Sequence, residues 1–317
     1  MRIKNARALS VAVILFIITL VGITQVPWKP MPTATPETIL RVVDDFGRNV
    51  SITKIPARIV SLAPGNTETL FALGLGSKVV GVTRLCDYPP EVPERVGIGD
   101  IKVIGGYANP SIERIVALEP DLVLASGSLQ RKTVDLLEEK GLRVVALNPK
   151  TIDQVLQNIR LVGKICGVAK KADELAESLE KRIGFVVSRV SGETKKPRIY
   201  YEIWHSPLMS AGSGTWVHEL ISLAGGLNIF SDAKQPYPVI SSETVIQRNP
   251  EIIIIKVGYM GEVAKEEIKR RPGWAVIDAV KNDRIYELEE NIVIRPSPRI
   301  VQGLEELAKI VHPMLFT

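Results

Sequence analysis

Cysteine and histidine are scarce in this chain, whose 317 residues include two cysteines and three histidines. Two cysteines cannot form a disulfide-dense scaffold, and because they are not in a CxxC pair they give no zinc or redox motif. Three histidines leave little material for a metal site built on several of them, so we expect none. Catalytic motifs are also missing: there is no GxSxG elbow, no P-loop and no GxGxxG that follows a strand. The sequence therefore does not indicate an enzyme, and we expect no cofactor.

Basic residues are too few to indicate nucleic-acid binding. The formal net charge is +5, and Arg2, Lys4 and Arg7 supply three of these charges, which leaves only +2 for the rest of the chain. A nucleic-acid-binding domain concentrates its basic residues on one face or along one helix. We therefore expect no nucleic-acid partner.

A long apolar run follows the three N-terminal cations and extends from Ala8 to Thr24 without a charge. As a helix, these residues would span roughly 26 Å at about 1.5 Å per residue, the lower limit for crossing a bilayer. Cations before such a run keep the N-terminus inside and send the rest of the chain outside. We expect residues 1–27 to be a signal peptide or a membrane anchor, with cleavage left open. A linker rich in proline and threonine (residues 28–38) would join it to an extracytoplasmic globule.

Short apolar runs alternate with segments of helical periodicity beyond this linker. The first two runs, ILRVV and NVSIT, surround the polar turn DDFGR and predict a hairpin over residues 39–53. Seven later runs predict strands, at residues 58–62, 79–82, 122–125, 144–147, 199–203, 252–256 and 284–288. Continuous apolar strands between helices are typical of parallel sheets covered on both faces. We expect an α/β protein with two parallel-sheet lobes, residues 39–150 and 193–317.

The segment between the two lobes, residues 151–192, has helical spacing of its apolar residues with one interruption at Gly167. This pattern predicts one long, rigid helical connection rather than a flexible hinge. A rigid connection predicts small movement of the lobes when a ligand binds.

One sequence unit occurs in both lobes. Ser111-Ile-Glu113 leads to Pro120 and the run DLVLA, and Ser242-Glu243 leads to Pro250 and the run EIIII. The glutamate precedes the proline by seven residues in both copies, and a helix that ends before a proline leads into an apolar strand in both. The lobes therefore look like one α/β module used twice, and the cleft between them is the expected ligand site.

Several motifs resemble those of one protein family. RVVDDFGRNVSI, RIVSLAPGNTETLFALGLGSKVVGVT and IERIVALEPDLVL are similar to the substrate-binding proteins of ABC importers for iron chelates and cobalamin, over about residues 41–311. DYPP, AGGLNIF, QPYPVISSE and RPSPRI resemble the cobalamin or corrinoid branch. The resemblance implies the class III periplasmic-binding-protein fold, with two α/β lobes joined by a long rigid helix. It also implies an ABC permease dimer with its cytoplasmic ATPase as partner, and a free protein that we expect to be monomeric.

The expected ligand is a corrinoid, a large flat disc that aromatic side chains contact well. Tyr88, Tyr107, Trp204 and Tyr237 fall at or near the ends of predicted strands, where open α/β sheets bind ligands. By the resemblance, the three tyrosines match ring-contacting positions of cobalamin binders, and Arg295 matches a cleft residue. The alternative for each aromatic residue is a partly buried position in a loop.

Two departures from the family pattern keep other ligands open. Ser126 stands where cobalamin binders can carry an aromatic residue, and residues 290–294 lack the expected aromatics. A corrinoid without its lower loop, a ferric siderophore or haem would also fit a less aromatic cleft. His205, beside Trp204, could be an axial ligand of a bound metal chelate or a hydrogen-bonded packing residue.

The duplicated glutamates, Glu113 and Glu243, match the family positions that dock onto arginines of the permease. The alternative is a local role, because a carboxylate near a helix N-terminus is stabilised by the helix dipole. An extracytoplasmic sensor without a transporter would make the two glutamates incidental. Cys86 and Cys166 could pair only with their Cα atoms within about 7 Å, and a buried thiol near the cleft is the simpler interpretation for Cys86.

Overall fold

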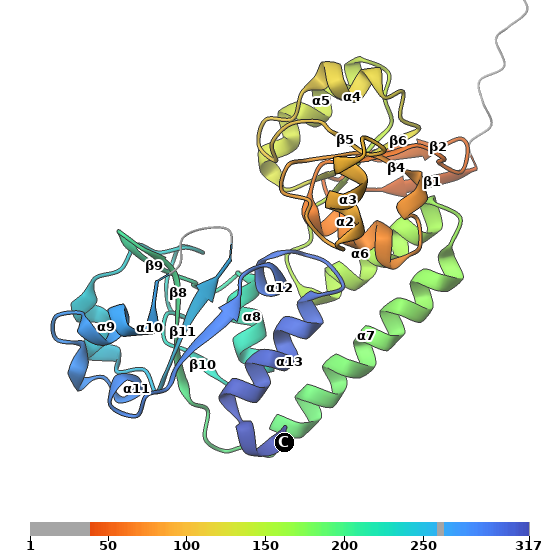
Figure 1. Cartoon of the computed structure of the whole chain (residues 1–317). Helices are drawn as coiled ribbons and strands as arrows, with labels where there is room; N and C mark the ends of the chain where they lie inside the picture. Colours follow the sequence, from red (N-terminus) through yellow and green to blue (C-terminus); the bar gives the residue numbers. More distant parts are fainter. Residues whose placement is uncertain (1–38, 259–262, 317) are drawn as a thin grey trace, which may run out of the picture. The chain divides into compact units, whose positions relative to one another are not determined.

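A computed structural model describes residues 39–258 and 263–316 (Figure 1). The predicted signal peptide or anchor (residues 1–27) and the linker (residues 28–38) lie outside the described residues. Among the helices of the described ranges, none is both long and apolar enough to cross a membrane.

The N-terminal lobe contains a five-stranded parallel sheet with the strand order β5-β4-β3-β6-β7. Its strands are β3 (Ile59–Ser61), β4 (Val79–Val82), β5 (Lys102–Val103), β6 (Leu122–Ser126) and β7 (Val144–Leu147). The surrounding helices are α2 (Pro64–Ala72), α3 (Glu91–Gly97), α4 (Ile112–Ala117) and α5 (Arg131–Glu139). The predicted hairpin is confirmed as β1 (Leu40–Val43) paired antiparallel with β2 (Asn49–Ile52).

Two separate cores on opposite faces of this sheet explain why its inner strands are mostly apolar. Ile59 and Leu124 point to the face that packs on α2 and α3, whereas Val60 and Val123 point to the face that packs on α4 and α5. Since successive residues of a strand point to opposite faces, a strand buried on both sides needs every position apolar. The predicted strands of this lobe are confirmed, and only β5, with two residues, had no recognisable run.

The C-terminal lobe contains a second five-stranded sheet, in which β10-β8-β11-β12 are parallel and β9 pairs antiparallel with β8. Its strands are β8 (Arg198–His205), β9 (Leu208–Ser210), β10 (Leu227–Asn228), β11 (Ile252–Val257) and β12 (Ile285–Glu289). Its helices are α8 (Trp216–Leu223), α9 (Ser242–Arg248), α10 (Lys265–Arg270), α11 (Asp278–Lys281), α12 (Asn291–Ile294) and α13 (Ile300–Val311). Helices α8 and α13 cover one face and α9, α10 and α11 the other (Figure 1). The antiparallel β9 is the one departure from the predicted parallel sheets among these strands.

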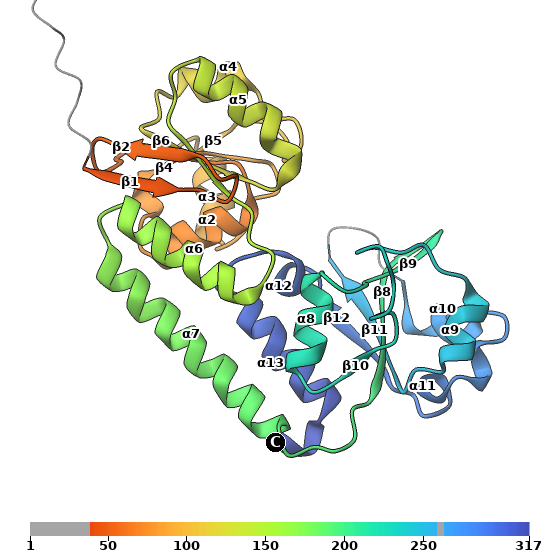
Figure 2. The same ribbon diagram turned by 180° about the vertical axis from the view of Figure 1, so that it is seen from behind.

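The connection between the lobes consists of two helices, α6 (Ile152–Ile165) and α7 (Ala169–Val190), so the prediction of a single long helix is wrong in this detail. The chain turns at Gly167, whose φ of +75° is favourable only for glycine. Helix α7 then folds back beside α6 and continues to the C-terminal lobe (Figure 2). Arg182 of α7 donates two hydrogen bonds, of 2.7 and 2.6 Å, to Glu305 of α13. The connection is helical on both sides of the turn, as expected.

Candidate ligand cavity and docking surfaces

A cavity of about 620 Å³ lies between the two lobes. The N-terminal lobe lines it with the loops that follow β3, β4, β5, β6 and β7, all at the carboxyl edge of the sheet. The C-terminal lobe contributes the start of α8, the loop around Tyr237, and the residues of and after α12. Cavities of about 300–1,000 Å³ are typical of small-molecule sites, and the carboxyl ends of parallel strands are their usual place.

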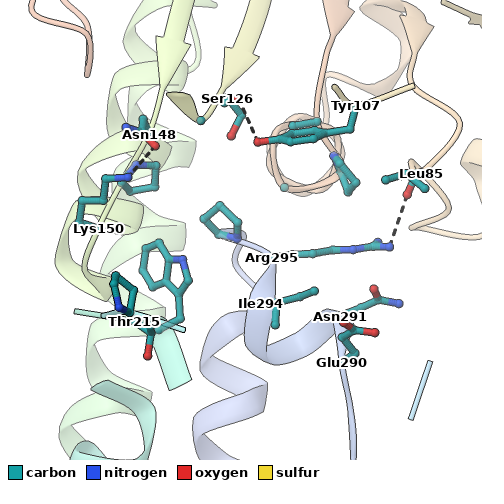
Figure 3. Close-up of a pocket in the computed structure, with 18 of the residues that line it drawn as sticks. Leu85, Tyr107, Ser126, Asn148, Lys150, Thr215, Glu290, Asn291, Ile294 and Arg295 are labelled. Atoms are coloured by element: carbon teal, nitrogen blue, oxygen red, sulfur yellow. Dashed lines mark hydrogen bonds between the residues drawn. The ribbon is translucent and has the colours of Figure 1, made fainter. Parts of the chain in front are cut away.

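Three aromatic side chains of the described part of the chain line this cavity: Tyr107, Trp216 and Tyr237. The Tyr107 hydroxyl donates a 3.0 Å hydrogen bond to the Ser126 carbonyl, which fixes the ring over the end of β6 (Figure 3). Burial raises the pKa of Tyr107 and of Tyr237, so both phenols stay protonated at neutral pH. The site therefore offers wide, neutral aromatic surfaces to a ligand.

Trp216 was not among the predicted cleft residues. It is the first residue of α8, and the Thr215 side chain caps this helix by accepting a hydrogen bond from the His218 backbone N–H at 3.2 Å. The glycine-rich run SAGSGT before the tryptophan is the signal that could have found it. A threonine N-cap after a loop predicts a helix start, and Trp216 is the first residue of the helix that this signal marks.

Arg295 lines the cavity but is already bound by carboxylates of the other lobe. Its guanidinium donates to Glu68 of α2 at 3.0 Å and to both carboxylate oxygens of Asp87 at 2.5 and 3.1 Å. Ser297 donates a 2.6 Å hydrogen bond to the second oxygen of Glu68. Burial raises the pKa of Glu68, because a desolvated carboxylate is costly to ionise, and the bonds from Ser297 and Arg295 offset part of this rise. Arg295 therefore joins the two lobes, and Figure 3 shows its further bond to the Leu85 carbonyl.

A second buried ion pair borders the cavity in the C-terminal lobe. Lys256, at the end of β11, donates a 2.9 Å hydrogen bond to Glu290, which lines the cavity. Both side chains are almost completely buried. Two cations of the N-terminal lobe, Arg84 and Lys150, also line the cavity. Neither of them forms an ion pair with another described residue.

Tyr88, Trp204 and His205 do not line the cavity, contrary to the prediction from the sequence. The Tyr88 ring lies under the guanidinium of Arg299 at 3.9 Å, which holds it outside the lining. Trp204 and His205 belong to the hairpin that β8 forms with β9, and their rings lie 5.2 Å apart beside a separate small recess. Trp204 and His205 therefore line this recess and not the cavity between the lobes. His205 is consequently not placed to ligate a metal held there.

Glu113 and Glu243 occupy the same position in two equivalent helices, α4 and α9. In each, a serine two residues earlier is the N-cap, Ser111 or Ser241, and it accepts a hydrogen bond from the backbone N–H three residues later. The residue equivalent to Ser111 is therefore Ser241. The repeated unit described from the sequence began at Ser242 instead. Hydrogen bonds from the backbone and from the capping serine hold the pKa of both glutamates below the usual range. Both carboxylates are fully exposed and charged at neutral pH.

The two cysteines are free thiols and both are buried. Cys86 accepts a hydrogen bond from the Thr67 hydroxyl at 3.2 Å and directly precedes the cavity residue Asp87. Cys166 ends α6, and burial raises its pKa to about 11. The expectation of a buried thiol at Cys86 near the cleft is confirmed.

Residues 59–292 match the protein family described as "Periplasmic binding protein". The chain belongs to this family. An uncharacterized ABC transporter substrate-binding lipoprotein of Bacillus subtilis, YvrC, is 32% identical to this binding protein over 86% of the chain and 85% of the relative. A vitamin B12-binding protein of Vibrio cholerae is 30% identical over 79% of the chain and 87% of the relative.

A solved structure adds a relative with a different ligand in its name. The periplasmic heme-binding protein RhuT from Roseiflexus, in apo form, is 28% identical to this binding protein, with a TM-score of 0.71 over 81% of the chain and 98% of its own chain. The relatives carry the names of binding proteins and not of enzymes. By family, the protein is an extracytoplasmic substrate-binding protein of the kind that serves ABC importers.

Proposed function

We propose that this protein captures a corrinoid, such as cobalamin, in the cavity between its lobes and delivers it to an ABC permease. The observation that carries the proposal is the set of three aromatic side chains, Tyr107, Trp216 and Tyr237, that line one cavity from both lobes. Aromatic rings give wide, rigid contact area at low entropic cost, which suits a flat macrocycle. The vitamin B12-binding protein of Vibrio cholerae, similar over most of the chain, supports the same ligand class.

Haem is the second candidate, because RhuT is a haem-binding relative. Haem iron needs an axial ligand, and histidine or tyrosinate are the common choices. His205 lies outside the cavity lining. The raised pKa values of Tyr107 and Tyr237 disfavour a phenolate, and Tyr107 already donates its proton to Ser126. A corrinoid brings its own lower axial ligand or accepts water, so it makes no such demand on the protein.

Delivery to the permease would use Glu113 and Glu243. Each is a fully exposed carboxylate at the first turn of a helix, α4 or α9, and the two helices lie one in each lobe. A single exposed ion pair contributes little. Two such contacts, held apart by a rigid protein, also fix the orientation of the docked pair.

Calorimetric titration of the purified full-length chain with cobalamin, cobinamide, haem and a ferric hydroxamate tests the ligand class. The proposal predicts saturable one-to-one binding of a corrinoid, with the haem and hydroxamate titrations at the level of the buffer control. Binding of haem or of the hydroxamate without any corrinoid binding would contradict it. The transport role would then remain with a different cargo.

A further inference from the structure

The residues that line the cavity distribute charge unevenly over its walls. Of the two acidic lining residues within the described ranges, Asp87 is held by Arg295 and Glu290 is held by Lys256. Two lining cations, Arg84 and Lys150, remain after this assignment, and within residues 39–258 and 263–316 neither forms an ion pair. The N-terminal wall of the cavity therefore carries positive charge that no protein carboxylate of the described ranges balances.

These two cations stand at opposite sides of the carboxyl edge of the sheet. Arg84 follows β4 and Lys150 follows β7, and strands β3 and β6 lie between them. Three strand spacings separate the ends of β4 and β7 by about 14 Å. The long side chains of both residues can thus reach a group that is held between them.

The local contacts of each cation leave donors free for a ligand. The Lys150 ammonium donates one 3.0 Å hydrogen bond to the Asn148 side chain, which orients it at the edge of the cavity (Figure 3). The Arg84 guanidinium lies against the loop of Gly106, next to Tyr107, and has no side-chain hydrogen bond to another described residue. Both residues are exposed at the edge of the cavity. A ligand that displaces water from their charged groups has to supply an acceptor or an opposite charge in its place.

We propose that Arg84 and Lys150 together bind an anionic group of the ligand. The identity of this anionic group rests on the proposed function. If the ligand is a corrinoid, the group is the phosphodiester of the nucleotide loop. The protein then prefers a complete corrinoid, such as cobalamin, to cobinamide, which lacks that phosphodiester. In haem the corresponding anions would be the propionate carboxylates.

The test compares Arg84→Gln, Lys150→Gln and the double variant in calorimetric titrations of the full-length protein with cobalamin and with cobinamide. Lys132→Gln is the matched control, because Lys132 is an exposed cation on α5 of the same lobe and does not line the cavity. Each single variant should weaken cobalamin binding by about 2- to 5-fold, as expected for a partly exposed charge pair, and the double variant by about tenfold. Cobinamide binding and the control should change by less than about twofold.

Salt provides a second, independent readout on the unmodified protein. Raising the salt from about 0.1 to 1 M shortens the screening length from about 10 to 3 Å, so cobalamin binding should weaken and cobinamide binding should not. Unchanged cobalamin affinity in the double variant, or an equal loss for cobinamide, would overturn the inference. If haem binds and corrinoids do not, the proposed function fails, but a loss of haem affinity in the double variant still supports the anion site. If a neutral ferric hydroxamate binds equally to all variants, both proposals fail.

Discussion

The outer parts of the two lobes are built alike, residue by residue, whereas their inner edges are not. In the N-terminal lobe, α4 is followed by Glu119 with φ of +45°, directly before a proline and strand β6. In the C-terminal lobe, α9 ends at Asn249 with φ of +41°, directly before a proline and strand β11. The left-handed residue lets the chain leave the helix before a proline that cannot continue it.

The residue after each proline is acidic, and its carboxylate accepts a backbone hydrogen bond at the start of a neighbouring strand. The Asp121 carboxylate accepts a 3.0 Å hydrogen bond from the Arg58 backbone N–H, at the start of β3. The Glu251 carboxylate accepts a 3.1 Å hydrogen bond from the Arg198 backbone N–H, at the start of β8. Because the two lobes share these details, Glu113 and Glu243 lie at equivalent positions in them.

The inner edges differ in chemistry. The N-terminal lobe presents the cations Arg84 and Lys150 beside the aromatic Tyr107, and the C-terminal lobe presents the aromatics Trp216 and Tyr237. Arg295 has no counterpart and bridges the lobes through Glu68 and Asp87. A repeated surface suits a two-fold partner, and an unequal cavity suits an asymmetric ligand, so transport and binding should respond to separate sets of substitutions.

The largest effect on stability should come from Arg295→Met, which removes the ion pairs that join the two lobes. Removing one partner of a buried ion pair costs about 3–5 kcal/mol. We expect the lower end of this range, because Glu68 loses its nearest cation but keeps Arg299 at 3.6 Å. The control is Arg182→Met, whose pair with Glu305 is partly exposed and should cost less than about 1 kcal/mol. Urea unfolding of the three proteins at neutral pH measures both values. Equal losses in the two variants would contradict the buried bridge.

The destabilisation caused by Arg295→Met should depend on pH in a defined direction. Burial raises the pKa of Glu68 above its ordinary 4.5 in the folded protein, so ionising it disfavours folding. Without Arg295, the pKa of Glu68 rises further. The destabilisation should therefore be smallest below about pH 4.5, where the carboxyl is protonated in both states, and should grow as the pH rises through the folded pKa. A loss that is constant with pH would show that Glu68 is not responsible.

Charge reversal of the repeated glutamates should abolish transport without affecting binding. In Glu113→Lys with Glu243→Lys, cations would face the cationic partner that we propose, and uptake in cells should fall by about tenfold or more. Glu139→Lys is the matched control, since Glu139 is an exposed glutamate of α5. Uptake and cobalamin affinity are measured in parallel. Unchanged uptake with intact binding would favour a sensor without a transporter.

The close approach of the lobes should be sensitive to one methyl group. A Cβ added to Gly65, at the start of α2, would lie 2.7 Å from the Pro296 carbonyl oxygen, so Gly65→Ala should cost about 1–3 kcal/mol through overpacking. Gly184→Ala is the control: no heavy atom lies within 4 Å of its added Cβ, and an alanine in the middle of α7 should stabilise by about 0.5–1 kcal/mol. Thermal unfolding distinguishes the two signs. A neutral Gly65→Ala variant would indicate a looser contact between the lobes.

The smallest change should be in the arrangement of the lobes on binding. Helix α7 is continuous over 22 residues and is joined to α13 by Arg182. The backbones of pre-organised proteins move by no more than about 1 Å on binding. Small-angle scattering with and without ligand should therefore show nearly the same radius of gyration. A larger, ligand-dependent contraction would show that the turn at Gly167 acts as a hinge.

Much of the fold followed from the sequence, and much of the site did not. Strands buried on both faces, such as β6 and β11, leave uninterrupted apolar runs that are easy to recognise. Gly167 marked an interruption, but periodicity alone does not show that a helix reverses direction there. Which loop residues face one cavity depends on side-chain direction beyond the strand ends, and for this reason Tyr88 and Trp204 were misplaced and Trp216 was missed.

Calorimetric titration of cobalamin into Tyr107→Ala and Trp216→Ala, with Tyr88→Ala as control, tests the binding site most directly. Tyr107 and Trp216 line the cavity from different lobes, whereas Tyr88 packs under Arg299 outside it. Loss of a stacked aromatic should weaken binding by about 0.5–1.5 kcal/mol beyond the lost contact area. We predict weaker binding in both cavity variants and an unchanged affinity in Tyr88→Ala. Weaker binding in Tyr88→Ala alone would place the ligand elsewhere and contradict the assignment of this cavity.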